Sequence, residues 1–242
     1  MMKKLKLITL LVISGTWLLS SCIKEGEPQP QLVGGSTFIN AFTEANAVYC
    51  YIDRSTVPAL NPLPYRNYGP ITPVYAYPGE DRRLEIYSTY NEDPLVDTAI
   101  TIQDSVYYST FVFGTHDNPQ HFITIDRVPE NTDDPAAIAA VRFFNLANTD
   151  KKVTLRIGDL ELDESFENRP TETAQTGKDN ENFIPVPTGS YTVSVIDENG
   201  ETLVTRETEI DLSAGKYVSI FLTGDEVGQT SFYIGRLQQW VN

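Results

Sequence analysis

The two histidines of the chain lie in one polar segment and are the first residues to consider for chemistry. His116 and His121 flank Asp117 within "GTHDNPQH", a stretch rich in turn-forming residues. Two imidazoles and a carboxylate are zinc ligands, but structural zinc sites take four ligands, and no nearby Cys or H-E-x-x-H pattern supplies the rest. A hairpin turn also directs neighbouring side chains apart. The segment therefore predicts a solvated loop, and we expect neither a metal nor a cofactor.

The possible nucleophiles lack the neighbours that catalysis needs. Ser109 and Ser219 lie within alternating runs and outside any G-x-S-x-G elbow. Cys50 alternates with tyrosines in "VYCYI", which is typical of a small buried side chain. The acidic clusters lack calcium-loop spacing. A carboxylate pair for glycoside hydrolysis would need a cleft, and this alternative stays open in so acidic a chain. We predict a protein without enzymatic activity.

The other cysteine, Cys22, has a different setting. Three lysines in the first six residues precede an apolar run over 7–19, and this run stops at "LSSC". A basic start and an apolar stretch of this length form a secretory signal. The end of the run resembles the bacterial lipobox, which implies cleavage before Cys22 and attachment of acyl chains such as palmitate to that residue. An ordinary secretory signal that happens to end near a cysteine is the alternative.

The residues after Cys22 are polar and Pro-rich, "IKEGEPQPQ", and predict a flexible tether over residues 22–35. No other segment is apolar over the roughly 20 residues that a membrane-spanning helix requires. Lys24-Glu25 resembles the acidic export signals of Bacteroidota surface lipoproteins. The resemblance implies an outer-membrane lipoprotein of the cell envelope, exposed at the surface, while display toward the periplasm stays open.

The charge balance excludes one class of partner. The chain has 18 Lys and Arg against 33 Asp and Glu, a net charge of −15 at pH 7. Without the lysine-containing signal segment the net charge is about −18, because three lysines and no acids leave with it. Such a field repels phosphate backbones, so we expect no nucleic-acid partner.

After residue 22 the chain shows β-type alternation and almost no helical periodicity. Asp197-Glu198-Asn199-Gly200 predicts a hairpin turn. The predicted strands form two series of seven: 37–42, 47–52, 74–77, 83–88, 98–102, 106–113 and 122–125, then 140–145, 152–157, 183–186, 191–196, 201–212, 216–222 and 231–234.

The two series repeat one another. Phe38-Ile39-Asn40 matches Phe143-Phe144-Asn145 at an offset of 105 residues, and "VYYSTFVFG" at 106–114 matches "KYVSIFLTG" at 216–224 at an offset of 110. The two asparagines end a first strand, where a carboxamide bonds its own turn backbone. A repeat of about 100 residues with seven strands is typical of an immunoglobulin-like sandwich.

The second series carries a family resemblance. "VRFFNLA" at 141–147 and "IPVPTGSYTV" at 184–193 resemble the bacterial domain-of-unknown-function family 4397 (DUF4397). The first series resembles it more loosely, through "TFIN" at 37–40 and Pro78-Gly79. The resemblance implies an extracytoplasmic β-sandwich lipoprotein of Bacteroidota type with tandem repeats, and implies no activity.

The predicted fold is all-β, with two tandem immunoglobulin-like β-sandwich domains after a lipoprotein signal peptide. The expected boundaries are 1–21 for the signal peptide, 22–35 for the tether, 36–127 for the first sandwich, 128–137 for the linker and 138–242 for the second, DUF4397-like sandwich.

The long insertions after the second strand of each series are the expected binding loops. The insertion at 57–70 carries Tyr65, Arg66 and Tyr68, residue types that anchor interfaces or stack on sugar rings. It could instead fold back over its own sheet edge. With Tyr75 and Trp240 these are the predicted contact residues. We expect a non-catalytic interaction or adhesion module, held to the membrane by its lipid, that binds an envelope protein or a host surface; a glycan-binding accessory of a polysaccharide-uptake system is the alternative.

Overall fold

The computed structural model describes residues 31–57, 62–129, 134, 136–226, 230–239 and 241. Residues Leu32–Asn242 form one compact unit. Among the described residues the helical elements are a 3₁₀ turn, η1 (Glu164–Phe166), and one short α-helix, α2 (Ala174–Asp179). The predicted all-β sandwich fold is confirmed. Cys22 and Trp240 lie outside the described residues.

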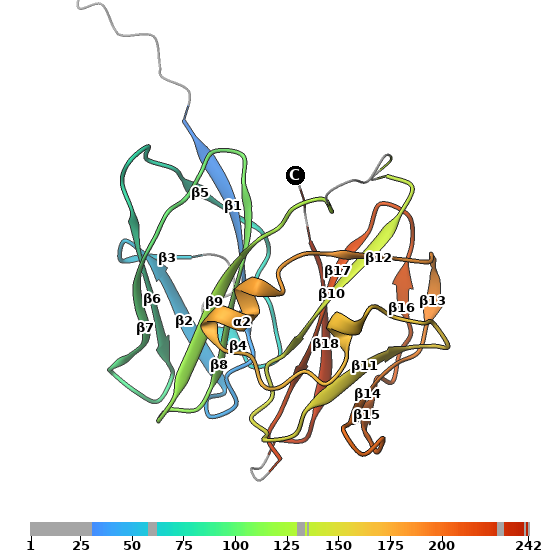
Figure 1. The fold of residues 1–242 in the computed structure, drawn as a ribbon. Helices are drawn as coiled ribbons and strands as arrows, with labels where there is room; N and C mark the ends of the chain where they lie inside the picture. Colours follow the sequence, from blue (N-terminus) through green and yellow to red (C-terminus); the bar gives the residue numbers. More distant parts are fainter. Residues whose placement is uncertain are drawn as a thin grey trace, which may run out of the picture. The chain divides into compact units, whose positions relative to one another are not determined.

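The first half of the unit is a sandwich of two sheets (Figure 1). One sheet has the order β5-β1-β8-β9, and the other has the order β3-β2-β6-β7 with β4 paired to β2. The strands are β1 (Val33–Asn40), β2 (Ala47–Ile52), β3 (Ser55–Thr56), β4 (Leu63–Pro64), β5 (Thr72–Tyr75), β6 (Arg82–Ser88), β7 (Pro94–Ile100), β8 (Tyr107–Gly114) and β9 (Pro119–Ile125).

The second half repeats this plan, with β12-β10-β17-β18 opposite β11-β14-β15 and the pair β13-β16. The predicted strand at 201–212 is two strands, because the chain leaves the sheet at Arg206. The strands are β10 (Ala139–Asn145), β11 (Val153–Ile157), β12 (Ile184–Val186), β13 (Gly189–Tyr191), β14 (Val193–Asp197), β15 (Thr202–Thr205), β16 (Ile210–Leu212), β17 (Tyr217–Thr223) and β18 (Tyr233–Gln239).

The two halves share details as well as strand order. In each, the first strand pairs in parallel with the second-to-last strand, β1 with β8 and β10 with β17. Asn40 accepts the N–H two residues on, at Phe42, and Asn145 accepts that of Ala147, as predicted. The distribution of strands differs from that of immunoglobulin domains, whose first two strands share a sheet, because β1 and β2 lie in opposite sheets.

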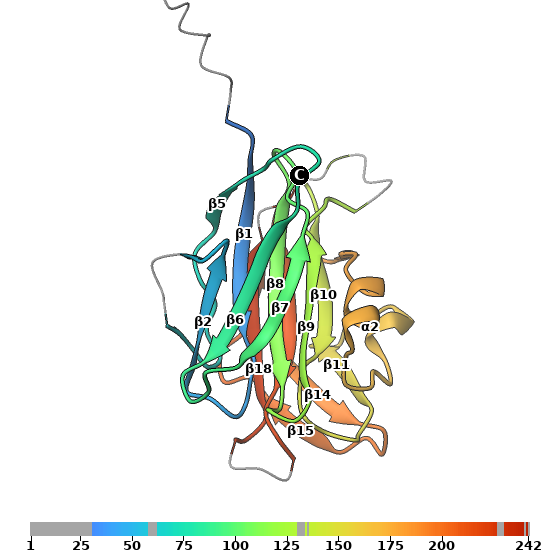
Figure 2. The same cartoon turned by 90° about the vertical axis from the view of Figure 1, so that its left-hand side faces the viewer.

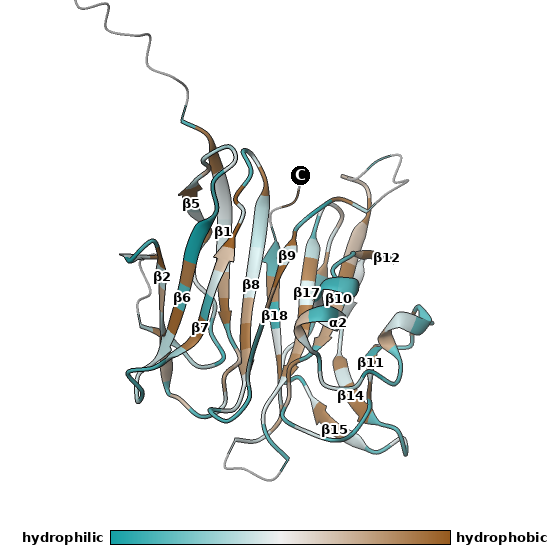
Figure 3. Cartoon of the chain, turned by 60° about the vertical axis from the view of Figure 1, so that its left-hand side comes forward, coloured by the Kyte–Doolittle hydropathy of each residue, from teal (hydrophilic) through white to brown (hydrophobic). Residues whose placement is uncertain are grey.

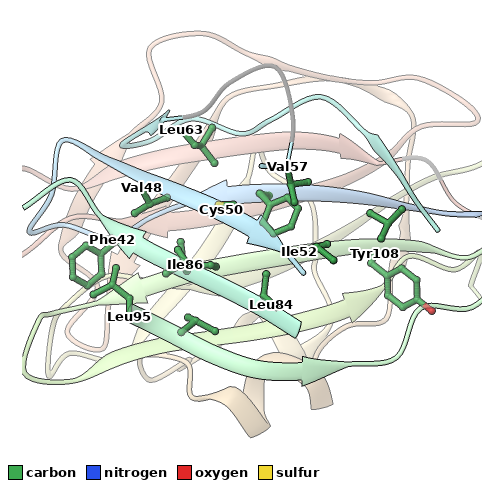
Figure 4. Close-up of a cluster of buried hydrophobic side chains, with 14 of the residues drawn as sticks. Phe42, Val48, Cys50, Ile52, Val57, Leu63, Leu84, Ile86, Leu95 and Tyr108 are labelled. Carbon is green, nitrogen blue, oxygen red and sulfur yellow. The ribbon is translucent and has the colours of Figure 1, made fainter. Parts of the chain in front are cut away.

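Each sandwich has its own apolar core, built by the inward residues of alternating strands. In the first half these include Val48, Cys50 and Ile52 of β2 and Leu84 and Ile86 of β6, all buried. Figure 4 shows these side chains gathered between the sheets. Figure 3 shows this alternation, with brown hydrophobic residues interrupted by pale and teal ones along strands such as β6 and β8.

A third core joins the halves. The outer faces of the β1-β8-β9 and β10-β17-β18 sheets pack on one another through aromatic rings, and Phe111 lies 4.9 Å from Phe144 and 4.8 Å from Phe122, centroid to centroid. Four layers of sheet result (Figure 1). The two inner sheets are covered on both faces, which explains why β10 and β17 are buried at every residue.

The insertions cross between the halves in both directions. From the first half, Tyr65 Oη lies 3.1 Å from Thr223 Oγ1. From the second half, α2 packs on β9, where Gly177 leaves room for the ring of Phe122, and Ile125 N–H donates to Glu181 Oε2 at 2.9 Å. The insertion of each half therefore packs against the other half.

Candidate binding surfaces

The solvent-facing side of the β2-β6-β7 sheet carries three tyrosines. Tyr49 and Tyr51 of β2 alternate with the buried Val48 and Cys50, and Tyr87 of β6 lies directly opposite Tyr49. All three are half-buried, so part of each side chain is exposed to solvent. We call Tyr49, Tyr51 and Tyr87 the tyrosine face; its sheet is turned toward the viewer in Figure 2.

A charged network borders the tyrosine face. Arg83 donates two hydrogen bonds to Asp97, at 2.8 and 2.7 Å, and lies 3.4 Å from Glu85. Tyr87 Oη donates to Glu85 Oε1 at 3.1 Å. The hydrogen bonds and charge of Asp97 raise the pKa of Arg83, and those of Arg83 lower the pKa of Asp97. Burial and the hydrogen bond to Glu85 raise the pKa of Tyr87. Arg83 and Asp97 are therefore charged, and Tyr87 is neutral, at physiological pH.

The alternation in "VYCYI" contains the signal for this face, because an inward Cys50 directs its neighbours outward. The predicted site residues did not include these tyrosines.

A groove of about 400 Å³ crosses the inner sheet of the first half at the start of β1. Gly35 is one of its lining residues, and the Tyr107 ring packs so closely on it that a Cβ there would lie 2.5 Å from the ring Cδ1. Tyr75, which is 49% exposed, pairs with the lining residue Val33. We call this feature the glycine groove; its lining residues are Val33, Gly34, Gly35, Ile71, Pro73, Ser105 and Tyr107.

The predicted contact residues of the 57–70 insertion lie in two different environments. Tyr65 and Arg66 face the second half: the Arg66 guanidinium donates to the Ser231 carbonyl and lies 4.9 Å from the Tyr233 ring. Tyr68 is 45% exposed and bridges to Ile39. Because Tyr75 pairs with Val33, six residues from Ile39 along β1, Tyr68 and Tyr75 do not form one platform. The insertion also pairs with β2 through β4, as the edge-covering alternative supposes.

The histidines lie on separate parts of the β8-β9 hairpin. The His116 ring packs edge-on against Phe42, with centroids 5.1 Å apart, while His121 lies in β9 opposite Val112. Burial lowers the pKa of His121. Within the described ranges, no group of three or more His, Cys, Asp or Glu side chains is placed to hold a metal ion. No helix in the same ranges is long and apolar enough to cross a membrane.

Ser109 and Ser219 are fully buried in a polar network between the halves. Ser109 donates to Asp126 at 2.7 Å, and Ser219 accepts from Arg142 Nε at 2.7 Å. Arg142 Nη2 and Asp126 Oδ1 form a buried ion pair at 2.6 Å. Burial raises the pKa of Asp126, while the charge of Arg142 opposes that shift. These serine hydroxyls serve structure, since no solvent reaches them.

Residues 37–156 match the family described as "Domain of unknown function (DUF4397)". The match spans the first half and the first two strands of the second, whereas the expected resemblance was stronger over 138–242. No curated protein matches the chain.

Among solved structures, the chain is similar to the carbohydrate-binding module CBMbc (family CBM26) of Eubacterium rectale Amy13K, whose structure was determined in complex with maltoheptaose. The identity is 10%, the likeness covers 84% of this chain and 96% of that chain, and the TM-score is 0.25. At this identity and score the likeness bears on neither ligand nor site.

Proposed function

We propose that the protein is a non-catalytic interaction module of the cell envelope that binds a partner protein through the tyrosine face. One observation carries this proposal: three tyrosine rings share the solvent-facing side of one sheet, beside an arginine held by two carboxylates. Tyrosine and arginine dominate the binding energy of protein interfaces.

The arrangement of the rings favours a protein partner over a sugar at this face. The Tyr51 and Tyr87 rings meet edge to face, with centroids 5.9 Å apart and an interplanar angle of 81°. Two rings at that angle offer no common plane on which successive sugar rings stack. They do suit an irregular protein surface, where each ring contacts a different group.

The experiment is a pull-down from envelope extracts with the 32–242 fragment. Recovery of a reproducible partner that the double variant Tyr51→Ala/Tyr87→Ala no longer retains would support the proposal. Tyr68→Ala is the matched control, because it removes an exposed tyrosine from a different sheet edge. Loss of the partner in the control alone would assign the contact to the 57–70 insertion, and recovery of no partner would count against an interaction module.

Anchoring at Cys22 is the second part of the proposal. The lipobox-like "LSSC" and the polar segment that follows support a lipid anchor that displays the unit at the outer membrane. A Cys22→Ser chain should take up no clickable palmitate, because acyl transfer requires the thiol. The matched Cys50→Ser chain should be labelled as strongly as the parent. A Cys22→Ser chain that still incorporates palmitate contradicts the lipoprotein assignment.

We also infer that the two halves are tandem copies of one domain. The same strand order, the same parallel pairing and the equivalent hydrogen bonds of Asn40 and Asn145 support this inference. Exchanging the equivalent asparagines for alanine should destabilise the 32–242 unit to a similar extent. A loss at only one of the two positions would contradict equivalent roles.

Glycan binding is the second candidate function, and the glycine groove favours it. An exposed tyrosine paired with a residue that lines a groove, together with the Tyr107 ring in the lining, is suited to stacking on one or two sugar rings. A glycan array with the 32–242 fragment tests this candidate. Binding that Tyr75→Ala abolishes and Tyr51→Ala leaves intact would assign a glycan to the groove, and an array without signal removes the idea.

A further inference from the structure

The first sandwich is open along one side. Its edge strands β7 and β9 come from opposite sheets and do not pair with each other. A cavity of about 300 Å³ lies along this seam. We call it the seam pocket; its lining residues are Ser36, Ala99, Ile100, Thr101, Ile102, Gln103, Tyr108, Thr110, Ile123, Ile125 and Lys178.

The equivalent seam of the second half is bridged. There the edge strands are β15 and β18, and Arg206, which follows β15, donates from Nη1 to the Ile234 carbonyl of β18 at 2.7 Å. In the second half, the Arg206 guanidinium thus spans the seam whose equivalent in the first half is open. The opening at this seam is therefore a feature of the first half and not of the fold that both halves share.

The walls of the seam pocket are mostly apolar. Ile100, Ile123 and Ile125 pack against the first core from its edge, and Ile102 and Tyr108 belong to that core. The hydroxyl-bearing residues Ser36 and Thr110 are buried beside them. An apolar wall with a few polar groups is typical of small-molecule sites, and this volume is at the lower end of the range for such sites, about 300–1,000 Å³.

One wall residue is a cation from the other half. Lys178 of α2 reaches the seam pocket because α2 packs on β9. Within the described residues no carboxylate lies within ion-pair distance of Lys178, although the whole chain carries a net charge of −15. Glu181 lies three residues after Lys178 in the chain. It contacts β9, because its Oε2 accepts the Ile125 N–H.

We propose that the seam pocket binds a single-chain fatty carboxylate of medium length, with the alkyl chain along the isoleucines and the carboxylate at Lys178. Apolar walls select the chain through the hydrophobic effect, and the unpaired ammonium selects a negative head group. The volume suits one short chain and excludes a two-chain lipid. This proposal is independent of the tyrosine face.

Three probes with the same eight-carbon chain test the proposal on the 32–242 fragment: octanoate, 1-octanol and octylammonium. Titration followed by amide chemical shifts should place all binding at β7, β9 and α2. Octanoate should bind roughly two- to fivefold more tightly than octanol, as expected for one solvent-exposed ion pair. Octylammonium should bind more weakly than octanol.

Three variants and a control separate the roles of charge and cavity. Lys178→Ala should remove the preference for octanoate and leave octanol binding unchanged, whereas Lys152→Ala, at another exposed lysine, should change neither. Glu181→Gln keeps the acceptor for Ile125 and should strengthen octanoate binding. Ile123→Trp should fill the seam pocket and abolish binding of octanoate and octanol, with thermal unfolding confirming that this variant is folded.

The outcomes that overturn the proposal are equally specific. They are no saturable binding of octanoate by the folded parent fragment, equal binding of octanoate and octylammonium, an unchanged octanoate preference in Lys178→Ala, or shifts that map to the tyrosine face or the glycine groove. Partner capture by the tyrosine face is a separate measurement, so one proposal can fail while the other holds.

Discussion

The buried pair of Arg142 and Asp126 is the residue-scale feature on which the junction depends. Arg142 also donates to the Glu181 carbonyl at 2.9 Å and lies 4.3 Å from the Phe183 ring centroid, so its guanidinium is enclosed on every side. Replacing Arg142 with Met leaves Asp126 buried without its cation, so its carboxyl must either stay charged and uncompensated or take up a proton. We expect the free energy of unfolding in urea to fall by about 3–5 kcal/mol.

The double variant Arg142→Met/Asp126→Leu is the control for that expectation. Removing both charges together avoids the uncompensated carboxylate, so the double variant should be more stable than Arg142→Met alone. A double variant that is the less stable of the two would mean that packing of the guanidinium, and not charge pairing, sets the cost.

Cys50 supplies a second residue-scale prediction. It is the only cysteine of the 32–242 fragment, and burial raises the pKa of its thiol to about 12 from 9.0. A raised folded-state pKa contributes stability that is fully present below pH 9 and is lost as the pH rises toward 12. The folded fragment should therefore resist a thiol-specific reagent at pH 8 and react only on unfolding. Fast reaction under native conditions would contradict burial within the sheet.

At the scale of the element, the β14-β15 hairpin depends on Asp197. Its Oδ1 accepts the N–H groups of Asn199 and Glu201, each at 2.9 Å, and Gly200 adopts a φ of +84°. The N–H bond from Glu201 is the largest of the interactions that lower the pKa of Asp197. A lowered folded-state pKa contributes stability that is present above the ordinary pKa near 3.8 and is lost as the pH falls below it.

Replacement by asparagine tests this dependence. Asp197→Asn keeps a side-chain acceptor but has no proton to gain, so stability should decline less steeply than in the parent between about pH 4 and pH 2. Urea unfolding at several pH values measures the slope. Asp159→Asn serves as the comparison, because Asp159 lies in a loop outside the hairpin. Parallel pH profiles of Asp197→Asn and the parent would contradict the role of the turn.

At the scale of the whole molecule, the core between the halves and the two crossing insertions predict cooperative unfolding. Phe111 contacts rings of both halves, at 4.8 Å to Phe122 and 6.4 Å to Phe221, centroid to centroid. We expect the 32–242 unit to unfold in one transition, with equal calorimetric and van't Hoff enthalpies. Phe111→Ala should lower the free energy of unfolding by about 3–5 kcal/mol.

The matched comparison at this scale is Tyr51→Ala, which removes an aromatic ring from the outermost sheet and leaves the junction intact. Tyr51→Ala should lower the free energy of unfolding by less than Phe111→Ala does. Two separate transitions in the parent would show that the halves unfold independently. The predicted boundaries at 127 and 138 are not tested by the compactness of the unit and stay predictions.

Much of the local structure followed from the sequence, because it depends on neighbours along the chain. Alternation placed Cys50 inward, the Asp197–Gly200 turn joined two strands, and Asn40 and Asn145 bonded their own turn backbone, as expected. Each of these features needs only a side-chain period of two or a turn of a few residues.

Only the tertiary structure decided which surfaces meet. Local alternation does not say that the second face of an inner sheet is also covered, so the pairing of Arg142 with Asp126 and the docking of Tyr65 and Arg66 on the second half had no local signal. The position of Lys178 beside the open seam likewise results from one half covering a strand of the other. Contacts between residues far apart in the chain depend on how complete sheets pack, and the physical reason is that each face is buried by whichever surface the rest of the fold brings to it.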